Sequence, residues 1–261
     1  MIRHDMPAAD YHAHASLNAS TLKAVARHPL AKVRYDLDHR TGYNPAFSLG
    51  TAAHSLILEQ DASDIVLIDF PDYRTKEARI SRDAALAAGK TPLLPHEHDQ
   101  VRAMRDAVMA HPDAGPLLTG HQAEVSVFAD VYGQPCKARL DAWHEDRSLI
   151  VDLKTTQDAD PAAFDRTAIQ WGYHLQQAHY QDVMEAETGA RPRFLFVLVE
   201  KAEPFLVSVV ELAQDFVDLG REMNHEAADT WARAVKDNHW PGYEGVSTVL
   251  MPTWAAPIEG E

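Results

Sequence analysis

The sequence predicts an α/β fold in which helices flank a mixed sheet. Helical patterns dominate the first 120 residues, where one short strand is expected at 65–68. Three strand-like segments follow between residues 123 and 154, and a helical stretch separates them from two buried strands at 193–200 and 205–210. A long acidic helix at 217–236 comes last. This order predicts helices packed around a sheet built from both groups of strands.

Length and composition predict one large domain that spans residues 1–261. The chain has 46% hydrophobic and 24% charged residues, which is typical of a soluble globular protein. Within the domain we expect a helical N-terminal segment at about 11–60 and an extended C-terminal tail at about 238–261. The longest apolar run, Phe194–Val199, is too short to cross a bilayer, and the N-terminus lacks a secretory apolar core. We therefore expect a cytoplasmic protein that makes no membrane contact.

Charge and cysteine content argue against several classes of protein. The net charge of −15 disfavours a protein that coats nucleic acid nonspecifically, so contact with DNA must be local. Residues 1–40 hold six Lys or Arg against four Asp or Glu, whereas residues 200–261 hold four against twelve. A surface that faces phosphate is therefore expected in the N-terminal half. The single cysteine, Cys136, excludes an internal disulfide and a four-cysteine iron–sulfur cluster supplied by this chain.

Two basic segments are candidates for contact with phosphate. A polar cap at 16–20 leads into a short helix that should end near His28–Pro29, and a second helical piece follows. Solvated amphipathic faces, or pairing with nearby acids, explain such cations equally well. The two groups are Lys23, Arg27, Lys32 and Arg34, and Arg74, Lys76, Arg79 and Arg82.

His54 stands out in a helix expected at 47–60. Gly50, Thr51, Ala52 and Ala53 precede it, and such small residues permit close approach by another element or a ligand. On these residues alone, a single histidine on an apolar helix is more often a buried core residue than a metal ligand.

A β-hairpin is predicted around residues 139–155. Strands are expected at 136–143 and 148–154, and Asp146 and Arg147 are the expected turn residues. Antiparallel pairing across this turn keeps the sum of the paired residue numbers constant. The register therefore predicts that Asp141 lies opposite Asp152 and that Arg139 lies opposite Lys154.

The predicted hairpin gathers ionisable groups on one patch. Asp152 and Lys154 share a face because strand side chains alternate. Opposed carboxylates destabilise a sheet unless a cation neutralises them, and Mg²⁺ takes carboxylate, water and phosphate oxygens. A lysine beside such an ion can orient or deprotonate an attacking water, which is the outline of phosphodiester hydrolysis. The alternative is an exposed hairpin with solvated charges, which the spacing alone favours.

Two further segments add polar side chains. The strand expected at 123–132 alternates, so Glu124 can face the acidic patch of the hairpin. Gln176 and Tyr180 are four residues apart in a predicted helix and so share one of its faces. Taken alone, this pair is better interpreted as a half-buried tyrosine beside a solvated glutamine.

Together these segments resemble the exodeoxyribonuclease VIII (RecE-like) nucleases of phages and prophages, which belong to the PD-(D/E)XK superfamily. In that superfamily an Asp on one strand is followed by D/E-x-K on the next. Here Leu140-Asp141 replaces Pro-Asp, and Asp152-Leu153-Lys154 is the D-x-K form. The resemblance covers most of residues 11–254, and its other segments are Tyr11-His12, Ser16, Ser20-Thr21-Leu22, Gly50–His54, Glu124-Val125-Ser126, Arg139–Trp143, Gln176–Tyr180 and Trp240–Tyr243.

The resemblance implies a PD-(D/E)XK, restriction-endonuclease-like fold and a role for each matching residue. His54, Glu124, Asp141 and Asp152 would form or support a site for Mg²⁺, with Mn²⁺ as an alternative ion. Lys154 would serve the attacking water. Gln176 and Tyr180 would form the Q-x-x-x-Y helix near DNA.

The resemblance also implies an exonuclease that acts on double-stranded DNA ends in phage-type recombination. Such an enzyme digests 5′ to 3′ and leaves a 3′ strand for a single-strand annealing protein. Together with the uneven charge, it leads us to expect a ring-like homo-oligomer whose basic surfaces face a channel. The alternatives are an endonuclease of the same superfamily and a noncatalytic module that retains the fold and binds DNA ends or a partner.

Overall fold

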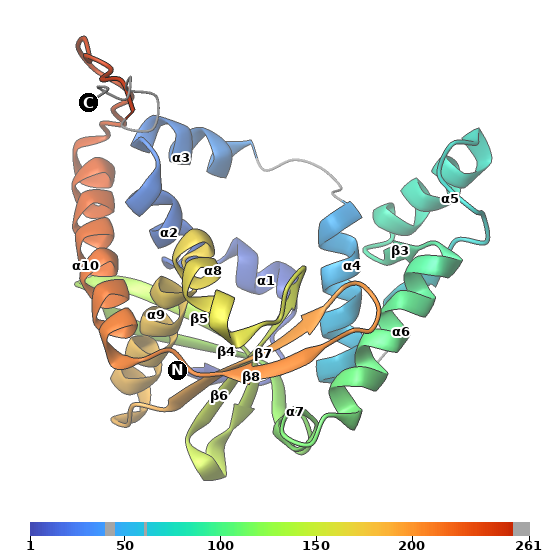
Figure 1. Cartoon of the computed structure of the whole chain (residues 1–261). Coiled ribbons are helices and arrows are strands. Elements are labelled where there is room, and N and C mark those ends of the chain that lie inside the picture. Colours follow the sequence, from blue (N-terminus) through green and yellow to red (C-terminus); the bar gives the residue numbers. More distant parts are fainter. Residues whose placement is uncertain (40–44, 60–61, 253–261) are drawn as a thin grey trace, which may run out of the picture.

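A six-stranded mixed sheet forms the centre of the computed structural model, which describes residues 1–39, 45–59 and 62–252 (Figure 1). Its strands are β1 (Ile2–Arg3), β4 (Gln122–Val131), β5 (Gln134–His144), β6 (Leu149–Thr156), β7 (Arg193–Glu200) and β8 (Val207–Val210). They lie in the order β1-β4-β5-β6-β7-β8. Neighbouring strands are antiparallel except β6 and β7, which are parallel. The predicted mixed sheet is thereby confirmed.

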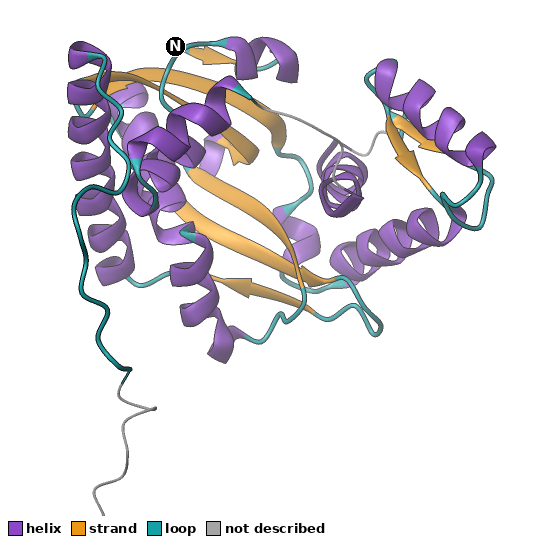
Figure 2. Ribbon diagram, turned by 90° about the horizontal axis from the view of Figure 1, so that it is seen from above, coloured by secondary structure: helices purple, strands orange, loops and turns teal. Residues whose placement is uncertain are grey.

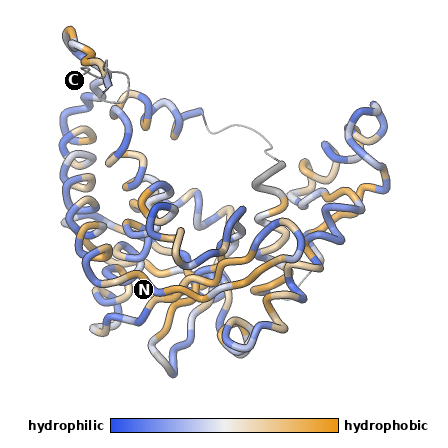
Figure 3. Tube along the Cα trace, viewed as in Figure 1, coloured by the Kyte–Doolittle hydropathy of each residue, from blue (hydrophilic) through white to orange (hydrophobic). Residues whose placement is uncertain are grey.

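Helices cover both faces of the sheet (Figure 2). On one face lie α2 (Ala19–Arg27), α3 (Leu30–Asp38), α8 (Phe164–Trp171), α9 (Tyr173–Thr188) and α10 (Gln214–Asp237). The other face carries α4 (Pro45–His54), a π-helical turn (Ser55–Glu59), α6 (Pro95–Ala110) and α7 (Ala114–Leu117). Apolar residues follow the central strands between these layers (Figure 3). We call the first layer the α9 layer and the second the α4 layer.

A smaller unit lies beside α4 and α6. β2 (Ile65–Leu67) and β3 (Thr91–Leu93) pair in parallel, and α5 (Lys76–Ala87) packs on them through Ala85. The predicted strand at 65–68 is confirmed, and α5 agrees with the helical pattern expected for this part of the chain. The sequence pattern did not predict β3, because Pro92 interrupts it and proline is disfavoured within strands.

Helix α2 begins and ends where local chemistry predicts. Asn18 precedes α2, and its side chain accepts a hydrogen bond from the Thr21 amide at 2.8 Å. The helix ends at Arg27, directly before His28-Pro29, as predicted. A short helix, α1 (Ala8–Ala13), precedes it. After α10, residues 238–252 contain no helix or strand, which agrees with the predicted extended tail. Among the described helices, none is long and apolar enough to cross a membrane.

The predicted hairpin is formed by β5 and β6 in the predicted register. Ala142 pairs with Val151, and His144 pairs with Leu149, so the sum of paired residue numbers is the expected one. The turn is longer than predicted, because a short 3-10 helix leads to Ser148, whose backbone is left-handed at φ 46°. A four-residue connection replaces the expected two-residue turn.

The ladder between β5 and β6 ends at the Ala142–Val151 pair. Neither of the two predicted pairs, Asp141 with Asp152 and Arg139 with Lys154, is therefore part of the ladder, and both predictions are wrong in this respect. Arg139 instead pairs with Ser126 on the other neighbour, β4. The ladder ends where the charged residues begin, yet Asp141 still contacts β6, because its side chain accepts a hydrogen bond from the Leu153 amide.

Side-chain alternation breaks at Glu124 on β4. Its backbone is left-handed, with a φ of 53°, which is uncommon for a residue other than glycine. Ala123 and Val125 should share a face, yet Ala123 packs in the α4 layer and Val125 in the α9 layer. On β5, Ala142 and Leu140 show the same switch. On both strands the pattern of side-chain directions thus shifts from one face of the sheet to the other, at Glu124 on β4 and at Asp141 on β5.

Candidate active site

Three adjacent strands and the end of one helix carry the four predicted metal ligands and Lys154. Glu124 comes from β4, Asp141 from β5, and Asp152 and Lys154 from β6. His54 is the last residue of α4, where the chain passes into the π-helical turn. Such turns are frequent at functional sites, because they redirect a side chain within an otherwise regular helix.

Small residues hold α4 close to the sheet. Ala52 and Ala53 are fully buried in the α4 layer. A Cβ placed on Gly50 would lie 3.9 Å from the hydroxyl oxygen of Thr155, which is ordinary contact. The segment thus lies against β6 at an ordinary distance that alanine would also permit at position 50, and this packing brings His54 to the carboxylates.

A cluster of three potential metal ligands forms at this point. One ligand atom each from His54, Glu124 and Asp141 lies within 4.8 Å of the other two. Nδ1 of His54 is 3.5 Å from Oδ2 of Asp141. That carboxylate oxygen also accepts a hydrogen bond from the Leu153 amide at 2.9 Å, which fixes its orientation against β6. An imidazole and two carboxylates are a donor set that suits a divalent cation.

The electrostatics of the cluster fit a cation as well. Burial, and then the Asp152 carboxylate, raise the pKa of Asp141 well above its usual range. Burial and the Lys154 ammonium lower the pKa of His54, so the imidazole is neutral at neutral pH, the form that binds metals. A divalent ion would stabilise the charged form of Asp141, which the protein alone disfavours.

Asp152 belongs to a separate, buried part of the site. Its side chain is 0% exposed, and it forms an ion pair with Nζ of Lys154. Its Oδ2 accepts a hydrogen bond from Nε2 of Gln176 at 2.6 Å. Asp152 is thus the one predicted ligand that does not join the compact cluster of His54, Glu124 and Asp141.

Lys154 is held by several partners at once. Burial lowers its pKa, but the Asp152 and Asp141 carboxylates outweigh burial and raise the pKa above its usual value. Its ammonium also lies 4.9 Å from the ring centre of Tyr173, in a cation–π contact. The amine is therefore charged and fixed beside the cluster when no metal is present.

Helix α9 presents Gln176 and Tyr180 to the sheet. Gln176 is 8% exposed, so the solvated glutamine of the alternative interpretation is not found. Burial raises the pKa of Tyr180 well above its usual value, and a side-chain hydrogen bond with Gln176 offsets part of this rise. A chain of contacts thus runs from Tyr180 through Gln176 and Asp152 to Lys154.

Arg139 is a site residue that sequence reasoning missed. It forms an ion pair with Glu124 and donates hydrogen bonds to Oγ of Ser126 at 3.0 Å and to the Met6 carbonyl at 2.9 Å. Its guanidinium lies over the ring of Tyr11. The available signal was its position two residues before Asp141, but the partner follows from the β4–β5 register.

The two basic segments behave differently from each other. On α3, Lys32 pairs with Asp36 at 2.9 Å and Arg34 pairs with Asp38, as expected for a solvated helix face. Lys23 and Arg27 on α2 instead reach the end of α8, where Arg27 donates to two backbone carbonyls. Arg74 and Arg82 pair with neighbouring aspartates, Asp72 and Asp83.

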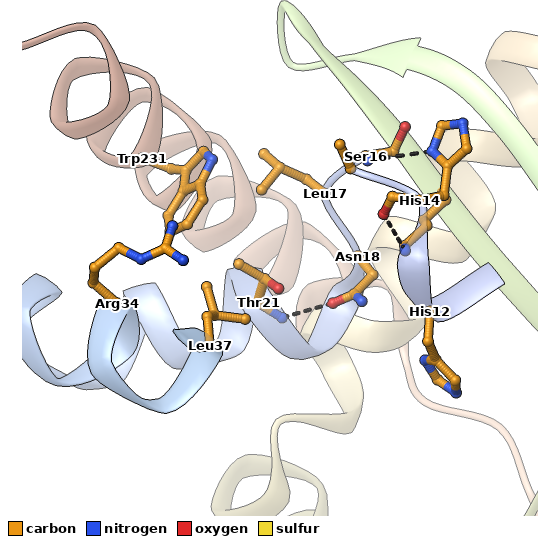
Figure 4. Close-up of a pocket in the computed structure, with 11 residues that line it drawn as sticks. His12, His14, Ser16, Leu17, Asn18, Thr21, Arg34, Leu37 and Trp231 are labelled. Atoms are coloured by element: carbon orange, nitrogen blue, oxygen red, sulfur yellow. Dashed lines mark hydrogen bonds between the residues drawn. The ribbon is translucent and has the colours of Figure 1, made fainter. Parts of the chain in front are cut away.

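Two cavities border the site, and a third lies elsewhere. One of about 580 Å³ is lined by His54, Glu124 and Arg139. Another of about 480 Å³ lies beyond Lys154 and is lined by residues that include Thr155 and Tyr173. The third, of about 380 Å³, lies between α2, α3 and α10 and includes none of the predicted site residues (Figure 4).

The sequence and the fold both match known proteins. Residues 18–250 match the family described as PDDEXK-like domain of unknown function (DUF3799). The structure is similar to that of a candidate exonuclease from Eubacterium rectale, with a TM-score of 0.67, 15% identity, and coverage of 91% of this chain and 88% of that one. A phage-related exonuclease from Haemophilus somnus 129PT has a TM-score of 0.37 and 12% identity, and the match covers 86% of this chain and 96% of that one. No curated protein matches the sequence.

Proposed function

Because the chain belongs to the family of PDDEXK-like domains DUF3799, we propose that it is a metal-dependent exodeoxyribonuclease that hydrolyses phosphodiester bonds at double-stranded DNA ends. The observation that carries the proposal is the cluster of His54, Glu124 and Asp141 beside the charged Lys154. A cation site next to a fixed amine suits the hydrolysis of a phosphodiester.

His54, Glu124 and Asp141 would hold the metal, which we propose to be Mg²⁺ or Mn²⁺. When bound, such an ion supplies charge neutralisation at the phosphate and a more acidic water. Asp141 is held in place by the Leu153 amide, and Glu124 by Arg139, so both carboxylates are oriented before an ion arrives. This preorganisation reduces the reordering that metal binding would otherwise require.

Lys154 would position the attacking water and stabilise the negative charge that develops on the phosphate. Asp152 sets the direction of its ammonium group through their ion pair. Gln176 holds the second oxygen of Asp152, so rotation of that carboxylate would break a hydrogen bond. In this proposal Asp152 and Gln176 act on the reaction indirectly, because they set the orientation of Lys154.

The direct test compares linear duplex DNA with covalently closed duplex DNA in the presence of Mg²⁺. We expect the pure protein to degrade the linear form and to leave the closed form intact. Addition of EDTA should stop degradation, and Mn²⁺ or Mg²⁺ should restore it. Cutting of the closed form would instead make the protein an endonuclease of the same superfamily. A protein that binds DNA ends without cutting them would be a noncatalytic module.

The proposal extends to assembly and partners. The net charge of −15 and the basic N-terminal segment favour a closed homo-oligomer that concentrates positive charge on an inward surface. We expect light scattering to give a mass that is a small multiple of the chain mass of 29.0 kDa. A monomer that releases DNA after each cut would contradict this part of the proposal. A role in recombination would further require a single-strand annealing protein as partner, which co-purification can test.

A further inference from the structure

An exposed tryptophan lies beside the candidate site. Trp171 is the last residue of α8, and it is 59% exposed. Among the described residues, its ring takes part in none of the close aromatic contacts. Its ring lines the same cavity as Tyr173, whose ring contacts Lys154, so it offers an aromatic face to a ligand beside the candidate site.

The backbone under Trp171 is anchored although the ring is exposed. The carbonyls of Ile169 and Gln170 accept hydrogen bonds from Arg27 at 2.6 and 2.7 Å. Gly172 follows with a φ of 68°, a left-handed backbone that favours glycine, and the side chains of Lys23 and Arg27 pack against it. Two cations of α2, Lys23 and Arg27, therefore hold the backbone that carries the Trp171 ring.

The cavity next to Trp171 has a lining that suits a nucleobase. Its volume is about 480 Å³, and it lies where the ends of β6 and β7 meet the α8–α9 turn. Threonine hydroxyls and glutamine amides offer both donors and acceptors, and one lysine adds a positive charge that the carboxylate of Asp158 balances. These groups come from Thr155, Thr156, Gln157, Gln170 and Lys201. Mixed donors and acceptors around an aromatic face accept any base without selecting one.

The cavity also borders the reactive amine. Thr155 directly follows Lys154, and the ring of Tyr173, which lines the cavity, contacts the Lys154 ammonium. On the opposite side of the site, the larger cavity beside His54 and Glu124 adds the carboxylates of Asp5, Glu59 and Asp64. With Glu124, that side carries four carboxylates, which Arg139 and the Lys90 partner of Asp64 offset only in part. On the Trp171 side, Lys201 balances Asp158, and Lys23 lies next to Trp171, so a phosphate backbone meets less negative charge there.

We propose that Trp171 stacks on the base of an unpaired nucleotide and that the adjoining cavity holds this nucleotide next to the phosphate to be cut. The inference rests on the proposed nuclease function and adds to it a class of ligand, an unpaired strand end, and the side on which that strand lies. Trp171 would act as a binding residue and would take no part in the chemical step.

The test uses a DNA duplex with a single-stranded overhang that carries 2-aminopurine, a base whose fluorescence falls when it stacks. EDTA is present, so that binding is measured without cleavage. We expect the wild-type protein to quench the fluorescence and Trp171→Ala to bind the overhang roughly ten-fold more weakly with little quenching. Trp171→Phe should retain part of both effects, because it keeps an aromatic face.

The matched control is Tyr243→Ala, which removes an aromatic residue that is 95% exposed in the C-terminal tail. It should bind and quench like the wild type. With Mg²⁺ present, Trp171→Ala should raise the KM for an overhang substrate by about ten-fold and leave kcat within about two-fold.

The outcomes separate this inference from the proposed function. Equal quenching by the wild type and Trp171→Ala, with cleavage of linear DNA intact, would overturn the inference and leave the nuclease in place. Quenching that depends on Trp171, in a protein that cuts no DNA, would support the pocket and contradict the nuclease. A fall in kcat without a change in KM would also overturn the inference, because it would place Trp171 in the chemical step.

Discussion

The two halves of the candidate site, the proposed metal half and the buried half, both contain carboxylates, which lie in different environments. In the metal half, the side chains of His54, Glu124 and Asp141 are 31%, 24% and 14% exposed. In the buried half, Asp152 is 0% exposed and is held by Lys154 and Gln176. Glu124 also has a cation as partner, and Asp141 also has an amide donor, so partners alone do not distinguish the halves. The comparison teaches that exposure, more than residue type, decides which carboxylates are placed to bind the proposed ion.

The largest effect is expected from Asp141→Asn in the metal half. An amide replaces a negative ligand, so Mn²⁺ binding measured by calorimetry should be lost, and cleavage should fall by more than about 10⁴-fold, beyond the usual contribution of one proton-transfer group. Stability without metal should change little, because the raised pKa of Asp141 already favours its neutral form, which the amide resembles.

Asp146→Asn is the matched control, because it alters an exposed acid in the turn of the same hairpin. It should leave metal binding and cleavage near the wild-type values. If Asp141→Asn bound Mn²⁺ as tightly as this control, the metal would have to be held by other residues.

Lys154→Ala removes the ammonium group that lies between the metal half and the buried half of the site, and it should lower the rate without weakening metal binding. The amine is proposed to act on the water and on the charge of the transition state, so kcat should fall by about 10²–10⁴-fold while KM changes little. Mn²⁺ affinity should not fall, since a nearby positive charge is removed. Steady-state kinetics on linear DNA measure the first effect, and calorimetry measures the second. An unchanged kcat with a raised KM would make Lys154 a phosphate-binding residue only.

Gln176→Ala tests whether the buried half acts through orientation. Loss of the hydrogen bond to Asp152 should lower kcat by about 10–100-fold, as for other residues that orient a site through a second residue. The matched control is Gln181→Ala, which removes a buried glutamine of the same helix whose amide bonds the Pro192 carbonyl at 2.8 Å. Both variants should lose comparable stability on denaturant unfolding. Equal loss of activity in both would mean that the helix is merely destabilised.

The smallest effect is expected from Arg139→Gln, which removes the cation that orients Glu124. Mn²⁺ affinity should fall by about ten-fold, and cleavage at saturating metal should recover most of the wild-type rate. Arg139→Lys should rescue part of the affinity, because it restores a positive charge beside Glu124. Affinity that rises in Arg139→Gln would show that the arginine competes with the ion for Glu124.

Much of the fold was predictable because its signals are local. The strand segments, the Asn18 cap and the β5–β6 register follow from alternation, side-chain chemistry and a constant sum of residue numbers. The site was partly predictable in the same way, because alternation places Asp152 and Lys154 together. The exceptions are non-local. β3 pairs with β2 in spite of Pro92, and the left-handed backbone at Glu124 has no signature in the sequence.

The sequence by itself determined which side chains could meet: three strands with acids at defined positions, a helix that ends in His54, and a lysine two residues after Asp152. Only the tertiary structure decided which of these side chains lie near Asp141 and which lie near Asp152. Packing of α4 under the sheet placed His54 against Asp141, and packing of α9 over the sheet placed Gln176 against Asp152. The physical reason is that a strand pattern specifies faces, whereas the partner of a charge depends on which helix covers that face.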